Sequence, residues 1–470
     1  MNNKLIKSIA LYGIGDFIVT GVTAFLFIPL YIKFLSPQDY GVFNILNNNL
    51  VLFTYIFQFG VVSAFGRIYF LKKALKREKE YTWNVIIFHV IYSLFLFGIY
   101  ILFKNNITNQ LSPSITNLQL VYYSPILAFL SFVPALYYVY LRLEDKANKF
   151  VFYQILTVLL VSIFIFLSFI FFKINLVGIL LSFIIANFII WIVVIFNLKF
   201  SVNYNFEDIH ETVVFAFPIF VGYIAYFFIS KYSIIILQNR ISLGEIGMFS
   251  LAQQIATVPS LITIAITKAV QPLLFSSESE SELKIKAQKF DSNFKLILIW
   301  IVGSIIFSVD TIFHFFLPIK YSPILNVTKY LLLINLVYNF SIVENTILLY
   351  KMKSNVILII TICGSVMNII LSNLLVREYG LNGVLVAMMV AFFLNFCLSL
   401  YFSRKYIKIN YDVKALFGSL FIILLFISAS FIKFFNSYNL YQIILSISCF
   451  IFLTLFILLI LKQKHVRVKE

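Results

Sequence analysis

Apolar runs as long as a bilayer is thick recur along the whole chain. Residues 151–172 read VFYQILTVLLVSIFIFLSFIFF, and residues 416–432 read LFGSLFIILLFISASFI. A helix needs about 20 apolar residues to cross a hydrocarbon core of about 30 Å. The core offers no water to backbone groups, so runs of this kind must be helices. A β-barrel would show alternating polarity over segments of about 10 residues, which is absent. We therefore expect an all-α integral membrane protein.

The sequence predicts fourteen membrane spans joined by short connections. They lie near residues 9–33, 42–64, 82–103, 118–139, 151–172, 176–198, 213–238, 247–271, 293–317, 326–350, 355–376, 382–402, 415–435 and 440–461. Lys and Arg are retained on the cytoplasmic side of a membrane. Residues 65–81 hold six of them and residues 104–117 hold one. We therefore expect both termini to be cytoplasmic, which the even number of spans also requires.

Two nine-residue segments of the chain are similar to each other. LSPQDYGVF begins at Leu35 and ISLGEIGMF begins at Ile241, 206 positions later (241 − 35). A second pair, residues 174–189 and 379–394, matches at an offset of 205 (379 − 174). Two matches at nearly the same offset indicate a duplicated six-helix unit followed by two helices. Because six is even, the two copies insert in the same orientation, as parallel repeats.

This duplication predicts the domain organisation. The expected parts are an N-lobe at 1–198, a cytoplasmic linker at 199–212, a C-lobe at 213–402, a second cytoplasmic linker at 403–414, and spans 13 and 14 with a basic tail at 415–470. Two pseudo-symmetric helical lobes are a transporter architecture, with substrate held between the repeats near the membrane midplane. Gly178, Ser182 and Ala186 recur every four residues, which predicts close helix packing rather than a site.

The charge and the motifs exclude several classes of function. The net charge of +17 is spread over many loops, which favours attraction to anionic membrane lipids over nucleic-acid binding. The chain has no phosphate-binding G-x-x-x-x-G-K-[ST], no H-E-x-x-H and no nucleophile elbow. We therefore expect no enzyme activity, no cofactor and no metal, and transport that is passive or driven by an ion gradient.

Several segments resemble a known family. They are FIPLYIKFLSPQDYGVFNI in the first hairpin, Arg67 just after span 2, NRISLGEIGMFSLAQQI in the second half, and YGLNGVLVA before span 12. They resemble the polysaccharide flippases, the O-antigen and capsule exporters of the multidrug/oligosaccharidyl-lipid/polysaccharide (MOP) superfamily. The resemblance covers essentially the whole chain, although its motifs are diffuse.

The resemblance implies a function. Such a protein moves undecaprenyl-pyrophosphate-linked oligosaccharide from the inner to the outer leaflet of the bacterial plasma membrane by alternating access. Its partners would be that lipid, membrane lipids and polysaccharide polymerase machinery. Arg67 matches the family's basic position, where it either meets the substrate headgroup or serves only as a topology signal.

Ionisable residues within spans are the strongest candidates for a site, because each costs about 3 kcal/mol or more at the bilayer centre. Lys231, deep in span 7, is expected to contact the pyrophosphate, or else to form an internal ion pair. Asp16 in span 1 would accept a coupling ion, pair with Lys231, or bond neighbouring hydroxyls. Lys268, near the inner end of span 8, either snorkels to the interface or lines the inner mouth. Glu344, two turns before Lys351, offers a gate or an ion-pair partner.

The repeat also aligns two pairs of amides. Asn47 and Asn48 of span 2 correspond to Gln253 and Gln254 of span 8 at the offset of 206. Amides donate and accept hydrogen bonds together, which suits sugar hydroxyls. We expect these four side chains to line the outward cavity, or else to bond neighbouring helices.

Three other functions remain open at this point. A cation-coupled multidrug exporter would need acidic residues in the cavity, and a lipid II flippase would place its site in the same seam. A membrane polysaccharide polymerase would carry a sizeable extracytoplasmic loop with catalytic residues. The longest outer connection, residues 104–117, contains no carboxylate.

Overall fold

The chain is helical throughout the part that the structure describes. A computed structural model describes residues 33–171, 175–198, 204–275, 279–316, 323–408 and 450–457, and single positions at 27, 29, 31, 277, 421 and 448. Within this part there is no β-strand. Ten of the helices or helix pairs are long and apolar enough to cross a membrane. The all-α membrane fold predicted from the apolar runs is confirmed.

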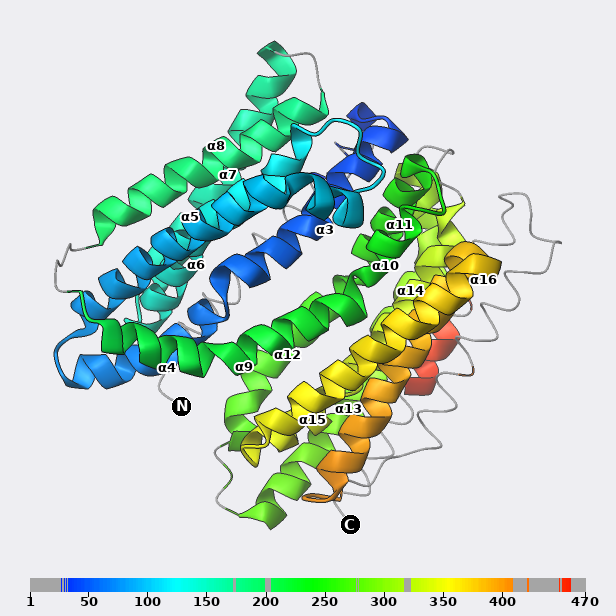
Figure 1. Cartoon of the computed structure of the whole chain (residues 1–470). Coiled ribbons are helices and arrows are strands. Elements are labelled where there is room, and N and C mark those ends of the chain that lie inside the picture. Colours follow the sequence, from blue (N-terminus) through cyan, green and yellow to red (C-terminus); the bar gives the residue numbers. More distant parts are fainter. Residues whose placement is uncertain are drawn as a thin grey trace. The chain divides into compact units, whose positions relative to one another are not determined.

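Most of the helices belong to a first compact unit of residues 1–250 and 365–384. They are α3 (Pro37–Gln58), α4 (Val61–Ala74), α5 (Glu78–Leu111), the short 3₁₀ helix η2 (Leu120–Tyr122), α6 (Tyr123–Leu143), α7 (Ala147–Phe171), α8 (Leu176–Asn197), α9 (Phe206–Ser230), α10 (Tyr232–Leu237) and the start of α11 (Leu243–Ala256). Helices α6, α7 and α8 pack side by side, and α9 packs along α3, α4 and α5 (Figure 1).

A second compact unit comprises residues 251–364 and 385–470. Its helices are the end of α11, α12 (Val258–Phe275), α13 (Glu280–Phe316), α14 (Ile324–Asn339), α15 (Ile342–Tyr350) and most of α16 (Ser354–Arg404). Helix α13 packs against both α12 and α14.

Predicted spans 2 to 12 each coincide with described helices. Spans 1, 13 and 14 lie mostly outside the described residues, so the count of fourteen stays a prediction. Spans 11 and 12 both lie in the 51-residue segment α16. At 1.5 Å per residue a helix of this length would be more than twice as long as one crossing requires. The chain changes direction at Gly380, whose φ of 54° and ψ of −127° are open only to glycine. The segment α16 is therefore two helices that meet at Gly380, one for each predicted span.

Several spans are broken near their middle. Span 2 is interrupted between α3 and α4, where Phe59 and Gly60 both have left-handed φ angles of 48° and 71°. Span 7 is interrupted at Lys231, which ends α9 and precedes α10. Breaks inside a membrane leave backbone groups that need partners other than lipid. Each break is therefore a place where another part of the protein comes close.

The first unit contains a large apolar core, which joins α4, α5, α6, α7, α8 and α9. Phe65, Tyr81, Phe132 and Phe150 are completely buried in it. On the opposite faces, large apolar side chains are exposed, as expected for contact with lipid; Leu102 is 80% exposed and Phe196 84%. The predicted packing stripe is confirmed, because Gly178, Ser182 and Ala186 are buried.

Candidate functional site

The two copies of the repeated segment begin equivalent helices with equivalent caps. Ser36 caps α3, and its Oγ accepts a hydrogen bond from the Asp39 backbone N–H at 3.0 Å. In the second copy the Ser242 Oγ accepts from the Glu245 N–H at 3.3 Å, and the Glu245 carboxylate accepts from the Ser242 N–H at 2.8 Å. This reciprocal arrangement is a capping box. The two repeated segments therefore begin their helices in the same way.

The two copies also touch each other. A Cβ added to Gly41 on α3 would lie 1.9 Å from the Leu243 carbonyl oxygen of α11. A Cβ added to Gly247 would lie 2.9 Å from the Gly41 nitrogen and 2.8 Å from the Pro37 carbonyl oxygen. The two helices therefore meet backbone against backbone, which only glycine permits. The duplication places this contact at the end of spans 2 and 8 that is predicted to face outward.

Helix α3 carries amide side chains along the part that follows this contact. Asn47 donates to the Phe43 carbonyl at 3.0 Å and accepts from the Tyr123 hydroxyl at 3.3 Å. Asn49 donates to the Ser112 hydroxyl at 2.6 Å. Asn48 is 4% exposed, and within the described residues neither atom of its amide has a hydrogen-bond partner. Asn47 and Asn49 thus bond neighbouring helices, whereas no described residue bonds the Asn48 amide.

A polar strip follows the contact between α4 and α9. The Arg67 guanidinium lies 5.0 Å from the centre of the Phe215 ring. The Ser63 and Tyr223 hydroxyls lie 2.6 Å apart. The Tyr223 ring stacks on Tyr55, with ring centres 5.0 Å apart and planes 17° from parallel. The sequence singled out Arg67 but gave no signal for the other four residues, because a chain with 28 Tyr and 55 Phe does not mark any one of them.

Lys231 lies at the break of span 7, where another helix takes over the free backbone groups. Its own N–H donates to the Phe227 carbonyl at 2.8 Å. The next two carbonyls, of Phe228 and Ile229, accept from the Asn368 amide of α16 at 2.9 and 3.3 Å. The Ser365 hydroxyl donates to the Ala225 carbonyl at 2.5 Å. Helix α16 therefore fixes the break, and with it the position of Lys231.

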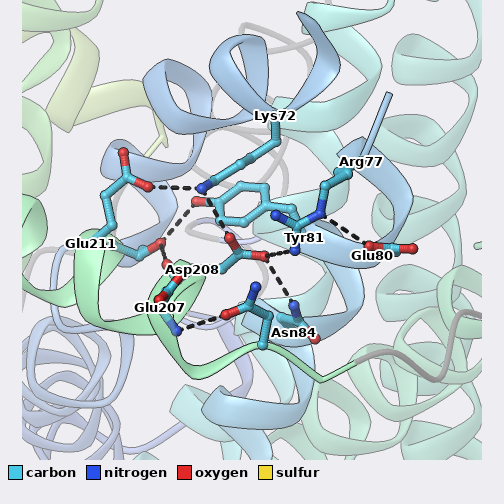
Figure 2. Close-up of polar contacts among 10 residues, drawn as sticks. Lys72, Arg77, Glu80, Tyr81, Asn84, Glu207, Asp208 and Glu211 are labelled. Atoms are coloured by element: carbon cyan, nitrogen blue, oxygen red, sulfur yellow. Dashed lines mark hydrogen bonds and ion pairs between the residues drawn. The ribbon is translucent and has the colours of Figure 1, made fainter. Parts of the chain in front are cut away.

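A buried carboxylate ties the start of α9 to α4 and α5. Asp208 is 1% exposed and lies 2.9 Å from the Lys72 Nζ and 3.3 Å from an Arg77 nitrogen (Figure 2). It also accepts from the Asn84 amide at 3.2 Å. Lys72 bridges further to Glu211 at 2.9 Å. The predicted cytoplasmic segments at 65–81 and 199–212 are thus joined by charge, and the second of them is already helical from Phe206.

We expect Asp208→Asn to weaken this junction by about 2–3 kcal/mol, because hydrogen bonds to two cations lose their charge. Amide hydrogen exchange should become faster in residues 205–212 and stay unchanged in α6. Glu80→Gln is the control, since Glu80 pairs with Arg77 at a partly exposed position. Equal exchange in both variants would contradict the role given to Asp208.

The second unit contains a buried ion cluster that the sequence did not suggest. The Lys295 Nζ lies 2.9 Å from Asp291 and 2.9 Å from Glu344, and none of the three side chains is more than 1% exposed. Glu344 was expected to act as a gate or to join an ion pair, and it joins this one, while Lys351 pairs with Glu280. The sequence held one signal for Lys295. The repeat offset of 206 aligns it with His89 (295 − 89), another buried basic residue.

The duplication is also visible in two ion pairs, one in each unit. Lys73 pairs with Glu144 in the first unit, and Glu280 pairs with Lys351 in the second. Both pairs span 71 residues, but the charges are exchanged. The Lys73 ammonium and the Tyr69 hydroxyl outweigh burial and lower the pKa of the Glu144 carboxyl. Both repeats therefore keep an ion pair at this place, with the acidic and the basic residue exchanged.

The remaining predicted residues are placed only in part. Asp16 lies outside the described residues, and of Lys268 only the position in α12 is described. Gln253 and Gln254 lie in α11 and belong to the second unit, whereas Asn47 and Asn48 belong to the first. That these four amides line one outward cavity stays a prediction. No group of three or more His, Cys, Asp or Glu able to hold a metal occurs in the described part.

Comparisons with known proteins agree with this fold. The family described as polysaccharide biosynthesis protein matches residues 5–278. The lipid II flippase MurJ in its inward closed conformation has a TM-score of 0.71 and 16% identity, over 97% of this chain and 100% of that chain. A multidrug resistance MATE family transporter of the MOP superfamily, inward-facing, has a TM-score of 0.65 and 14% identity, over 83% and 94%. An outward-facing one scores 0.58 with 16% identity, over 85% and 95%. Among curated proteins there is no match.

Proposed function

Because this chain belongs to the polysaccharide biosynthesis protein family of the MOP superfamily, we propose that it is a flippase for a lipid-linked oligosaccharide. Its substrate would be undecaprenyl-pyrophosphate-linked oligosaccharide, moved from the inner to the outer leaflet of the bacterial plasma membrane for a cell-surface polysaccharide such as O-antigen or capsule. Both termini would be cytoplasmic. The protein would act by transport and not by chemical conversion.

The observation that carries this proposal is the exposed Arg67 guanidinium just after span 2, in the predicted cytoplasmic segment 65–81. An exposed cation at this end of the helix would meet an anionic headgroup that enters from the inner leaflet. The planar donors of the guanidinium fit the oxygens of a phosphate. Lys231, held at the break of span 7, would supply a second cation along the path. Two cations favour a pyrophosphate over a cationic drug.

Alternating access would use the contacts already described. The backbone contact between Gly41 and Gly247 would seal the outward end while the substrate enters from the inner leaflet. Separation of the predicted lobes, 1–198 and 213–402, would then open that end. The polyprenyl tail would stay in lipid throughout, so that only the headgroup crosses the apolar layer.

Lys231→Ala should reduce export of surface polysaccharide at least tenfold without unfolding the protein. The reason is that the substrate's charge would lose one of its two cations. Export is measured by complementing a deletion strain, and folding by gel filtration and thermal unfolding in detergent. Lys353→Ala, at an exposed position before α16, is the control. Wild-type export by Lys231→Ala would remove this residue from the mechanism.

Mass spectrometry of lipids co-purified in mild detergent tests the substrate directly. Enrichment of a polyprenyl-pyrophosphate oligosaccharide over bulk lipid supports the proposal and identifies the sugars. Enrichment of lipid II would instead identify a lipid II flippase. If neither lipid is enriched and the protein shows cation-dependent drug efflux, it is a multidrug exporter.

A further inference from the structure

The face of α4 that carries Ser63 and Arg67 is exposed, and one turn further on it carries Phe70 and Leu71, which are 53% and 54% exposed. Val61, Ala64, Phe65 and Ile68 of the same helix are buried in the apolar core. Ser63 and Arg67, one turn apart, point away from that core and are exposed. Ser63 lies at the predicted inner end of span 2 and Arg67 just after it, so both are expected where the protein meets the cytoplasmic headgroup layer. The two side chains therefore present a hydroxyl and a cation to groups that approach this end of α4.

Helix α9 contributes Tyr223, whose hydroxyl can either donate or accept a hydrogen bond. The Tyr223 and Ser63 hydroxyls lie 2.6 Å apart, and either oxygen can be the donor. Each hydroxyl has one donor and two acceptor sites, so the pair keeps both kinds available for a third group. One face of the Tyr223 ring is fixed, because it stacks on the Tyr55 ring with the ring centres 5.0 Å apart.

Arg67 is held in a conformation that leaves its donors available. Its guanidinium lies 5.0 Å from the Phe215 ring centre, a distance at which cation and ring attract each other. In the described part of the chain it has neither an ion pair nor a hydrogen bond with a carboxylate. Stacking on a ring uses the flat face of the guanidinium and leaves the N–H groups at its edge free to bind an anion.

We propose that Ser63, Arg67, Phe215 and Tyr223 form a saccharide-phosphate subsite, which we call the α4–α9 strip. Arg67 binds a phosphate oxygen of the headgroup. The first sugar lies against the Tyr223 ring, and its hydroxyls bond the Tyr223–Ser63 pair. Phe215 and Tyr223 are eight residues apart, or about 12 Å along α9, so phosphate and sugar occupy neighbouring places. This assignment rests on the proposed function and names the residues that read its substrate.

A purely structural role for the same residues makes a different prediction. Phe59 and Phe220 also stack between α3 and α9, with ring centres 4.6 Å apart. If Tyr223 only adds to this aromatic packing, its ring is needed and its hydroxyl is not. Tyr223→Phe keeps the ring and removes the hydroxyl, so it separates the two roles without disturbing the helix contact.

Native mass spectrometry of the full-length protein in detergent tests the subsite. The probes are undecaprenyl pyrophosphate and the same lipid carrying one N-acetylglucosamine. We expect Tyr223→Phe and Ser63→Ala to weaken binding of the sugar-bearing lipid about tenfold and to leave the bare lipid unchanged. Arg67→Gln should weaken both about tenfold. Tyr138→Phe is the matched control, because the Tyr138 hydroxyl bonds the Thr157 hydroxyl at 2.9 Å away from the strip.

The possible outcomes separate the subsite from the function. If the wild-type protein binds the sugar-bearing lipid and Tyr223→Phe binds it equally well, the strip is not the sugar subsite, although the proposed function stands. If Arg67→Gln binds both lipids like the wild type, the phosphate assignment is wrong. If the wild-type protein binds neither lipid, the proposed function fails together with the strip.

Discussion

Gly247→Leu should lower transport at least 100-fold while the protein still inserts and folds. A Cβ at this position lies within 3 Å of backbone atoms of Pro37 and Gly41, and backbone atoms cannot rotate aside as a side chain can. The leucine would push α3 and α11 apart, so the contact between the two repeated segments could not form. Two states of a transporter differ by only a few kcal/mol, and a clash of this size removes one of them. Surface polysaccharide in a complemented deletion strain is the measurement.

The matched control is Gly98→Leu. A Cβ at Gly98 in α5 has no atom within 4 Å, so the same substitution adds a side chain to an open face. A cysteine pair at positions 37 and 244 gives an independent readout, because a Cβ on Gly244 lies 3.4 Å from the Pro37 Cβ. The pair should cross-link in the wild-type background and not beside Gly247→Leu. Normal export by Gly247→Leu would show that the backbone contact has no part in transport.

Lys295→Met should destabilise the protein by about 3–5 kcal/mol, the usual penalty for leaving a buried charge without its partner. Lys295 lies 2.9 Å from both Asp291 and Glu344, and all three side chains are closed to solvent. Methionine fills a similar volume, so the loss is electrostatic and not a packing defect. The midpoint of thermal unfolding in detergent should fall by several degrees.

Two further variants identify the cause. Lys286→Met removes the ammonium that pairs with Glu282 on the exposed side of the same helix, and should change stability by no more than about 1 kcal/mol. Adding Glu344→Gln to Lys295→Met should recover part of the loss, because one unpaired carboxylate disappears. If Lys295→Met is no less stable than Lys286→Met, the buried cluster contributes nothing to the fold.

The membrane fold was largely predictable from the sequence, but its interruptions were not. Apolar length alone predicted spans 2 to 12, since only a helix satisfies a backbone in hydrocarbon. The breaks at Phe59–Gly60 and at Lys231 depend on neighbouring helices, such as the Asn368 amide that bonds the carbonyls of Phe228 and Ile229. Such partners lie more than a hundred residues away and leave no local pattern.

The candidate site was predictable where an isolated charge stood among apolar residues. Lys231 stood out for this reason, whereas Arg67 was named because it matches the basic position of a family that the chain resembles. Lys295 did not stand out, because it lies near the end of its span and resembled a loop residue. Asp208 was missed because it fell within a predicted linker. Tyr223 and Ser63 are candidates only because their hydroxyls lie 2.6 Å apart. They are 160 residues apart in the sequence, so the sequence did not predict this contact.

The buried Asn48 amide has an energetic consequence for the proposed transport cycle. Leaving one buried polar group without a partner costs about 1–3 kcal/mol, and within the described residues neither atom of this amide has one. In the alternating access that we propose, an arrangement that admits water or a sugar hydroxyl to Asn48 would recover this energy. The free-energy difference between the two arrangements would then be smaller, so less binding energy would be needed to shift the population.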